Sequence, residues 1–246
     1  MQLRDFKVLS FDCYGTLIDW ESGIISALKP LTSALKGRQG KGTSISRDEI
    51  LQAHARHESS LQRATPSKRY SDLLATVYRR LAEQWGVKVT WDDCLRYGGA
   101  VKDWPAFPDS AEALRYLKQH YKLVILSNVD NASFAGSNAR LKVDFDAIYT
   151  AEDIGSYKPA AANFDYMLAQ LAGLGFAKSD VLHVAESMFH DHAPANRQQL
   201  ASCWVYRRHG SDGFGATMAP ADMPSYDFRF NSLGELAAAH RAQAAG

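Results

Sequence analysis

Near its N-terminus the chain reads VLSFDCYGT (residues 8–16), a short apolar run that ends in a polar turn. A near-continuous apolar run of this length predicts a strand buried on both faces, as the strands of parallel sheets are. Similar runs occur at residues 123–126, 181–184 and 203–206, with a weaker one at residues 147–150. Helical patterns lie between them, at residues 110–121 and 163–174, and this alternation predicts an α/β domain with a parallel sheet.

The segment after the first strand differs from the rest of the chain, because it contains one helical pattern after another and no buried strand. The predicted helices span residues 22–35, 46–63, 71–85 and 91–101, with an exposed loop at residues 37–42. We therefore predict an all-helical cap domain, residues 18–104, inserted into an α/β core made of residues 1–17 and 105–246.

Length and composition narrow the class of protein further. The 246 residues are 46% hydrophobic and 22% charged, as in a globular chain long enough to bury a core. With a formal charge of +1, the chain has no overall excess of positive charge that would favour binding to nucleic acid or to an anionic membrane. Three widely spaced cysteines, Cys13, Cys94 and Cys203, argue against disulfides and a structural zinc site. Because no apolar segment reaches signal-peptide or membrane-span length, we expect a cytoplasmic protein.

Chemically capable side chains follow the predicted strands at their carboxyl ends, where open parallel sheets bind ligands. In chain order they are Asp12 and Thr16, Ser127 and Asn128, Lys158, and finally Glu186 and Asp191. Each of these residues alone is usually a turn or capping residue. Their joint occurrence at four strand ends predicts that they converge on one site.

These segments resemble the four motifs of the haloacid dehalogenase superfamily. DCYGT (residues 12–16) is similar to the first motif, Ser127-Asn128 to the second, Lys158-Pro159 to the third, and Glu186 to Asp191 to the fourth. The helical insertion resembles the cap domain of that superfamily, and the resemblance implies a Rossmann-like core.

Within the superfamily, the DxYGT form resembles the L-2-haloacid dehalogenase branch, because Tyr14 stands where phosphatases carry a second Asp. The similarity extends over nearly the whole chain to hydrolases of L-azetidine-2-carboxylate. The segments that carry it are FDCYGTLIDWE, VKDWPAFPD, YKLVILSN, GSYKP, HDHAPAN and YRRHG.

Four residues are predicted to be catalytic. The Asp12 carboxylate can displace a leaving group and form an ester that water later cleaves. Gly15 and Thr16 are expected to place backbone N–H groups and a hydroxyl beside it. Lys158 can keep Asp12 ionised and attract the substrate. Since a lysine freed from an active-site cleft leaves no large apolar void, Lys158→Met should leave the melting temperature unchanged or slightly raised. The resemblance associates Asp191 with the hydrolytic half-reaction.

Tyr14 bears on the class of reaction. Phosphoryl transfer requires a proton on the leaving oxygen, and a phenol with a pKa near ~10 is a poor acid at neutral pH. A halide leaves without a proton, so Tyr14 can serve as a pocket wall. In phosphatases the acidic pair that Glu186 and Asp191 resemble helps to hold Mg²⁺. We expect neither a metal nor another cofactor here.

Two departures from the dehalogenase pattern concern the leaving group. Glu186-Ser187-Met188 replaces the Ser-Ser-Asn run of that branch, and Phe164 replaces a tyrosine. Opening of L-azetidine-2-carboxylate at C2 by Asp12 would give an ester and then 2-hydroxy-4-aminobutyrate, and an added carboxylate, Glu186 or Glu58, could favour the leaving amine. The alternatives are an (S)-2-haloacid dehalogenase, a Mg²⁺-dependent phosphatase and a catalytically silent binding protein.

Contacts to a small carboxylic acid substrate are expected from both domains. The predicted substrate-binding residues are Tyr14, Trp20, Arg56, Ser127, Asn128 and Glu186. Arg56 resembles the cap arginine that dehalogenases place near the substrate, although a solvated helix face explains it equally well. The histidines at positions 183, 190 and 192 are expected to be structural. The branch commonly forms homodimers, which leaves a dimer possible here.

Overall fold

The computed structural model describes residues 1–39 and 45–244 of the chain. Its strands are β1 (Val8–Phe11), β2 (Lys122–Ser127), β3 (Ala147–Thr150), β4 (Val181–Ala185), β5 (Ser202–Val205) and β6 (Phe228–Phe230). They form one sheet in the order β3-β2-β1-β4-β5-β6, and every neighbouring pair is parallel. This doubly wound arrangement confirms the predicted α/β fold.

The sheet lies between two layers of helices. The core helices are α6 (Ser110–Leu117), α7 (Asn131–Leu141), α8 (Ala151–Ile154), α9 (Ala161–Gly173), α10 (Ala193–Arg197) and α11 (Leu233–Ala244). One face of the sheet packs against α9 and α10, where Val124 and Met167 are buried together. The other face packs against α6, α7 and α11, where Leu9 and Leu114 lie in the larger core. Burial on both faces explains the near-continuous apolar runs of the central strands.

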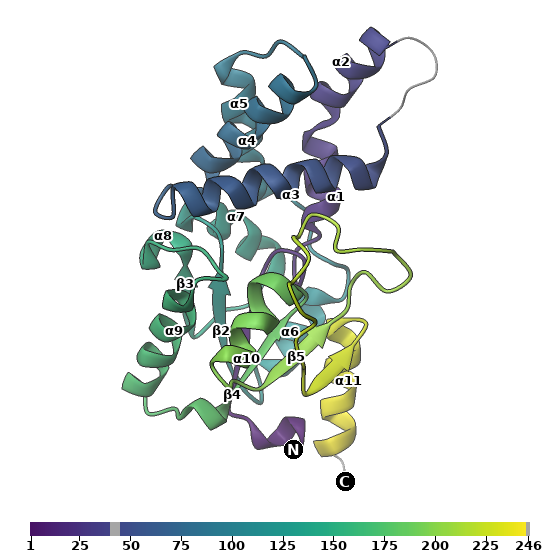
Figure 1. Cartoon of the computed structure of the whole chain (residues 1–246). Helices are drawn as coiled ribbons and strands as arrows, with labels where there is room; N and C mark the ends of the chain where they lie inside the picture. The colour runs from purple at the N-terminus through teal and green to yellow at the C-terminus, as the bar shows by residue number, and fades with distance from the viewer. Residues whose placement is uncertain (40–44, 245–246) are drawn as a thin grey trace.

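The helices inserted after β1 form a layer of their own. They are α1 (Trp20–Ala27), α2 (Lys29–Gln39), α3 (Arg47–Ala64), α4 (Tyr70–Gln84) and α5 (Trp91–Gly98). In Figure 1 this cap lies above the sheet, on the side of the strands' carboxyl ends, and both chain termini lie at the opposite end. Within the described part of the chain, no helix combines the length and apolar character needed to cross a membrane.

Two adjacent segments, residues 14–19 and 104–107, connect the cap to the core. The N–H of Asp19 donates to the Pro105 carbonyl (2.8 Å), and Ile18 forms isolated β-bridges on both sides. The chain therefore leaves the core and returns to it at neighbouring points, just beyond β1.

Several element boundaries differ from the predictions. The helix expected at residues 22–35 is two helices that meet at Leu28, because Pro30 has no N–H to continue a helix and fits only in the first turn of α2. The helix expected at residues 91–101 ends at Gly98, and a 3₁₀ turn follows it. Gly98 packs so closely against α4 that a Cβ there would lie 2.2 Å from the Ser71 carbonyl oxygen.

Helices α7, α8 and α10 and strand β6 were not predicted. Helix α7 is rich in Asn, Ser and Gly, which are poor helix formers, and it begins where the Asp130 side chain accepts a hydrogen bond from the Ser133 N–H. Strand β6 is an edge strand of three residues, too short to show a pattern. The loop expected at residues 37–42 begins within α2, and the remainder lies outside the described residues.

Candidate active site

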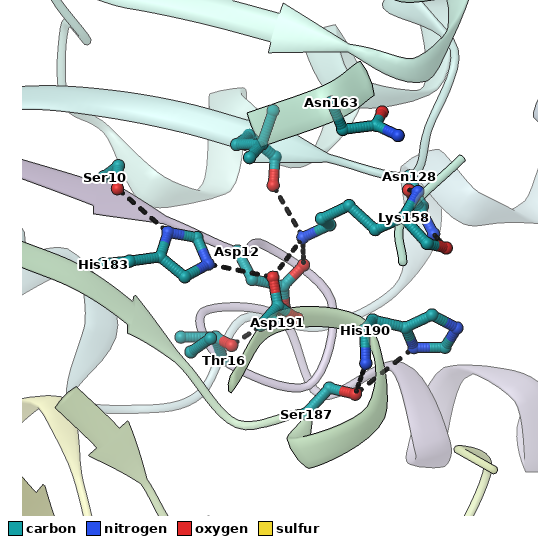
Figure 2. Close-up of polar contacts among 12 residues, drawn as sticks. Ser10, Asp12, Thr16, Asn128, Lys158, Asn163, His183, Ser187, His190 and Asp191 are labelled. Carbon is teal, nitrogen blue, oxygen red and sulfur yellow. Dashed lines mark hydrogen bonds and ion pairs between the residues drawn. The ribbon is translucent and has the colours of Figure 1, made fainter. Parts of the chain in front are cut away.

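Asp12 directly follows the central strand β1 and is 6% exposed. Its N–H extends the pairing with β4 by donating to the Val184 carbonyl (3.1 Å), so the sheet fixes the position of this residue. The Thr16 hydroxyl donates to Asp12 Oδ2 (2.8 Å) and accepts from the Glu186 N–H (3.0 Å). Thr16 thus ties the Asp12 carboxylate to the loop that follows β4 (Figure 2).

The turn after Asp12 differs from its predicted role. Gly15 adopts φ +96°, which glycine tolerates best, and this lets the chain reverse beneath the carboxylate. Its N–H donates to the Ile18 carbonyl (2.8 Å) and is therefore not available to the Asp12 carboxylate. The expectation that the Gly15 N–H lies beside that carboxylate as a donor is wrong. The N–H groups of Cys13, Tyr14 and Thr16 find no hydrogen-bond partner among the residues that the structure describes.

Lys158 lies between two carboxylates and is only 1% exposed. Its Nζ donates to Asp12 Oδ1 (3.0 Å), to Asp191 Oδ1 (2.6 Å) and to the Leu126 carbonyl (2.8 Å), which uses all three protons (Figure 2). Burial works to lower the pKa of Lys158, but the two carboxylates outweigh it and raise that pKa. Because the lysine is buried and paired with two carboxylates, its removal should destabilise the fold, contrary to the expectation of an unchanged or slightly raised melting temperature.

The two carboxylates differ in basicity. Burial raises the pKa of Asp12 above its ordinary value, and the Lys158 ammonium offsets only part of this shift. Burial acts on Asp191 as well, but Lys158 and the hydrogen bond from His183 outweigh it and lower the pKa of Asp191. Asp12 is therefore the more basic carboxylate of the pair, which suits it to attack carbon.

Ser127 and Asn128, the second predicted pair, have different surroundings in the structure. The Asn128 amide donates to the Lys158 carbonyl (3.0 Å) and accepts from the Lys158 N–H (2.7 Å), so it positions the lysine. The buried Ser127 hydroxyl has no hydrogen-bond partner within the described residues and lines the cavity beside Asp12. Ser127 is thus free to contact a ligand.

A small cavity of about 30 Å³ lies over Asp12 at the junction of core and cap. The charged or polar residues that line it come from both domains: Asp12, Tyr14, Ser127, Asn128, Lys158, Ser187, His190, Asp191 and Thr217 from the core, and Trp20, Glu58, Gln62 and Tyr70 from the cap. The cavity therefore holds three carboxyl groups and a single ammonium group.

Glu58, on α3, brings the acidic group of the cap to the cavity. Its Oε1 accepts from the Tyr70 hydroxyl (2.8 Å) and from Gln62 Nε2 (3.3 Å). Its Oε2 has no hydrogen-bond donor in the described part of the chain, and His54 Nδ1 lies 3.6 Å away. Burial raises the pKa of Glu58 to about 7 and lowers that of His54 to about 3. Near neutral pH, Glu58 can thus either accept or donate a proton in the cavity.

The structure does not bring Arg56 to this cavity. Arg56 is exposed on α3, and it lies two residues before Glu58, roughly 200° around the helix. Glu58 and Gln62, four residues apart, share the face that points to the core. Helical periodicity therefore puts an acid, and not a base, over the site.

Trp20 and Glu186 lie at the border of a second, larger cavity. Trp20 lines both cavities, whereas Glu186 lines only the second one, together with Glu21 and Arg208. Burial raises the pKa of Glu186 to about 8, and the nearby Glu21 adds to this shift. The structure thus places the Glu186 carboxyl group beside the Asp12 cavity and not within it.

Tyr14 forms part of the cavity wall. Its hydroxyl pairs with Ser137 Oγ (2.9 Å), and its ring meets Trp104 edge-on at a centroid distance of 5.6 Å. Burial raises the pKa of Tyr14 well above the ordinary value, which makes the phenol a still weaker acid.

The acidic pair that resembles the magnesium ligands of phosphatases is divided between two cavities. Asp191 lines the cavity over Asp12, whereas Glu186 lines only the neighbouring one, so the two carboxyl groups do not face one site. Among the residues described, no three His, Cys, Asp or Glu side chains are arranged to hold a metal ion.

Gln62 and Tyr70, which line the cavity from the cap, were not predicted from the sequence. Ser10 was not predicted either, and His183 was expected to be structural, without a link to the site. Ser10 and His183 are register partners in β1 and β4, and both are fully buried. His183 Nε2 lies 2.9 Å from Asp191 Oδ1, so this histidine supports the site, whereas His192 bridges Ser202 and the Ala185 carbonyl. A polar residue in each of two otherwise apolar strands was the available signal.

The fold and the site together define a doubly wound α/β protein with a helical cap and a candidate aspartate nucleophile. Residues 6–187 match the family model described as haloacid dehalogenase-like hydrolase, so the chain belongs to that family. No curated protein sequence matches the chain.

Solved structures resemble the chain over nearly its full length. An L-2-haloacid dehalogenase from Xanthobacter autotrophicus, with chloropropionic acid covalently bound, is 18% identical with a TM-score of 0.74, covering 96% of this chain and 98% of its own. A putative HAD-hydrolase from Bacillus subtilis, bound to magnesium, is 17% identical with a TM-score of 0.69, covering 94% and 96%. At such identities the likeness establishes the shared fold.

Proposed function

We propose that the protein hydrolyses small 2-substituted carboxylic acids through an ester on Asp12, and that its substrate is L-azetidine-2-carboxylate. The observation that carries the proposal is the buried Asp12–Lys158–Asp191 array, with the Glu58 carboxyl group facing it from the cap. The array supplies a nucleophile and a base, and Glu58 supplies an acceptor for a ring nitrogen.

The bonds balance without a co-reactant other than water. The Asp12 carboxylate forms a bond to C2 of the substrate, whose ring nitrogen is protonated. The C2–N bond breaks, and the nitrogen keeps the electron pair and leaves as a neutral primary amine. Water then attacks the ester carbonyl, which regenerates Asp12 and releases 2-hydroxy-4-aminobutyrate. The proton released in the second step protonates the amine that formed in the first.

The charge of the cavity supports a substrate that carries a cationic nitrogen. The ammonium of Lys158 is already shared by two carboxylates, so the cavity has no unpaired cation among its described lining residues. A protonated ring nitrogen would gain a charge-assisted hydrogen bond to Glu58 Oε2. The substrate carboxylate would use donors of the cavity wall that have no partner among the described residues, among them the Ser127 hydroxyl and the Tyr14 N–H.

A second candidate, an (S)-2-haloacid dehalogenase, has the same nucleophile and is favoured by the fold shared with the solved dehalogenases. A halide would meet the Glu58 carboxyl group in the cavity, with Arg56 on the far side of α3. A phosphatase is the least favoured, because the buried Tyr14 is a poor acid for a leaving alkoxide.

Turnover of three substrates, each with and without EDTA, tests the proposal. We expect hydrolysis of L-azetidine-2-carboxylate that survives chelation, and little or no turnover of L-2-chloropropionate or of a generic phosphate ester. Turnover confined to chloropropionate would establish the dehalogenase. Phosphate ester hydrolysis that is lost with EDTA and restored by Mg²⁺ would overturn both carbon-centred reactions.

Glu58→Gln should lower kcat/KM for L-azetidine-2-carboxylate by roughly 10- to 100-fold, because it removes a charged hydrogen bond to the ring nitrogen. Since burial raises the pKa of Glu58 to about 7, ionisation of this acid should make wild-type kcat/KM rise as the pH increases through about 7. The glutamine variant should lack that rise. Steady-state kinetics across the pH range measure both effects.

Arg56→Gln, an exposed substitution on the same helix, is the matched control and should leave these kinetics unchanged. Cyclobutanecarboxylate, which has the same ring size without the nitrogen, should inhibit the wild type and Glu58→Gln equally. A loss of activity in Arg56→Gln together with normal activity in Glu58→Gln would reverse our assignment of the cap residue.

A further inference from the structure

A buried chain of polar groups runs from Asp191 away from the cavity and into the sheet. His183, in the middle of β4, places Nε2 2.9 Å from Asp191 Oδ1 and Nδ1 2.9 Å from Ser10 Oγ (Figure 2). The ring of Phe164 packs edge-on against His183 at a centroid distance of 5.1 Å. Two hydrogen bonds and an aromatic contact thus fix the imidazole, although it lies on the side of Asp191 remote from a substrate.

The two oxygens of Asp191 have unequal surroundings. Oδ1 contacts both Lys158 Nζ (2.6 Å) and His183 Nε2 (2.9 Å). Oδ2 is buried and has no hydrogen-bond partner anywhere in the described residues, and Asp191 lines the cavity that contains Asp12. A carboxylate anchored twice through one oxygen is held against rotation, so Oδ2 remains the oxygen available to a third group.

We propose that His183 is a positioning residue for the second half of the reaction, the hydrolysis of the ester on Asp12. This inference rests on the proposed function. In that step the water oxygen bonds to Asp12 Cγ, and one water proton passes to Asp191 Oδ2. The bond from Cγ to the product oxygen then breaks, and that oxygen takes the proton from Asp191. His183 keeps Oδ2 aimed at the water by holding Oδ1.

His183 matters more for this step than for the first because of the charges. While Asp12 is free, the Lys158 ammonium is shared between Asp12 and Asp191. Once Asp12 is esterified it carries no charge, and Asp191 becomes the charged partner of Lys158. Without His183, the Asp191 carboxylate is free to rotate and give both oxygens to the ammonium, which removes the base from the water.

The test separates ester formation from ester breakdown. His183→Leu removes both hydrogen bonds while keeping an apolar side chain among the buried residues of β4. In rapid-quench experiments with L-azetidine-2-carboxylate, we expect ester formation near the wild-type rate. We expect ester breakdown to be slower by about 10- to 100-fold, part of what a general base supplies. Mass spectrometry of the quenched protein should then find the ester accumulated on Asp12.

Two further variants keep the inference open to refutation. His183→Gln can still donate an N–H towards Asp191 and should restore much of the breakdown rate. His183→Asn can pair with Ser10 but is shorter, so it should accumulate the ester even if His183→Leu fails to fold. Equal slowing of both steps, or no accumulation in a folded variant, overturns the role of His183. Absence of any ester in the wild type would instead refute the proposed function.

Discussion

Replacement of Asp12 by asparagine is expected to abolish turnover, lowering kcat by about 10⁴-fold or more. The amide cannot form the ester, and no other carboxylate in the cavity has the position that β1 gives to Asp12. The fold should survive, since Lys158 keeps Asp191 as a charged partner and the Leu126 carbonyl as an acceptor. Steady-state kinetics and thermal unfolding measure the two expectations.

Isotope labelling identifies the atom that attacks. In a single turnover in ¹⁸O-labelled water with enzyme in excess, the label should enter the Asp12 carboxyl group, because water attacks the ester carbonyl. The product hydroxyl should remain largely unlabelled, since its oxygen comes from Asp12. Label found only in the product would mean that water attacks C2 directly, and Asp12 would then be at most a base.

Lys158→Met is expected to lower kcat/KM by about 100-fold or more, equivalent to about 3 kcal/mol of transition-state stabilisation. Without the ammonium, Asp12 is harder to ionise and repels Asp191 across the site. The variant should also be less stable, by about 3–5 kcal/mol, because removing one member of a buried charge network leaves the others unpaired. Kinetics and chemical denaturation of the same preparation measure both effects.

The double variant Lys158→Met/Asp191→Asn separates these effects of Lys158. Removal of the second unpaired carboxylate should recover part of the stability and none of the activity. Lys178→Met, at an exposed lysine that binds the Gln198 carbonyl, is the surface control and should change neither quantity much. Wild-type activity in Lys158→Met would show that this lysine only shapes its loop.

Much of the candidate site was accessible from the sequence because parallel strands bring their carboxyl ends to one edge. Four separate strand ends delivered Asp12, Ser127, Lys158 and Asp191, and in the structure all four face one cavity. This inference needs only the strand positions and the parallel topology, which apolar runs separated by helices reveal.

The cap contributions could not be read in the same way. Arg56 was proposed because it resembles the cap arginine of dehalogenases, but the packing of α3 turns Glu58 and Gln62, and not Arg56, to the cavity. The place of Glu186 could not be predicted from the sequence either, because the turn after β4 determines which of the two cavities its side chain lines. Element boundaries at Leu28 and Gly98 likewise follow from tertiary contacts.

The attachment of the cap has a consequence for how such enzymes change over evolutionary time. Its two ends lie side by side, at residues 14–19 and 104–107, so it is joined to the core much as an inserted domain is. An exchange of this module would bring a new neighbour to the place of Glu58 and leave Asp12, Lys158 and Asp191 in their sheet. The catalytic residues of the core and the substrate-contacting residues of the cap can thus evolve separately. A lineage can keep the reaction while it changes the substrate.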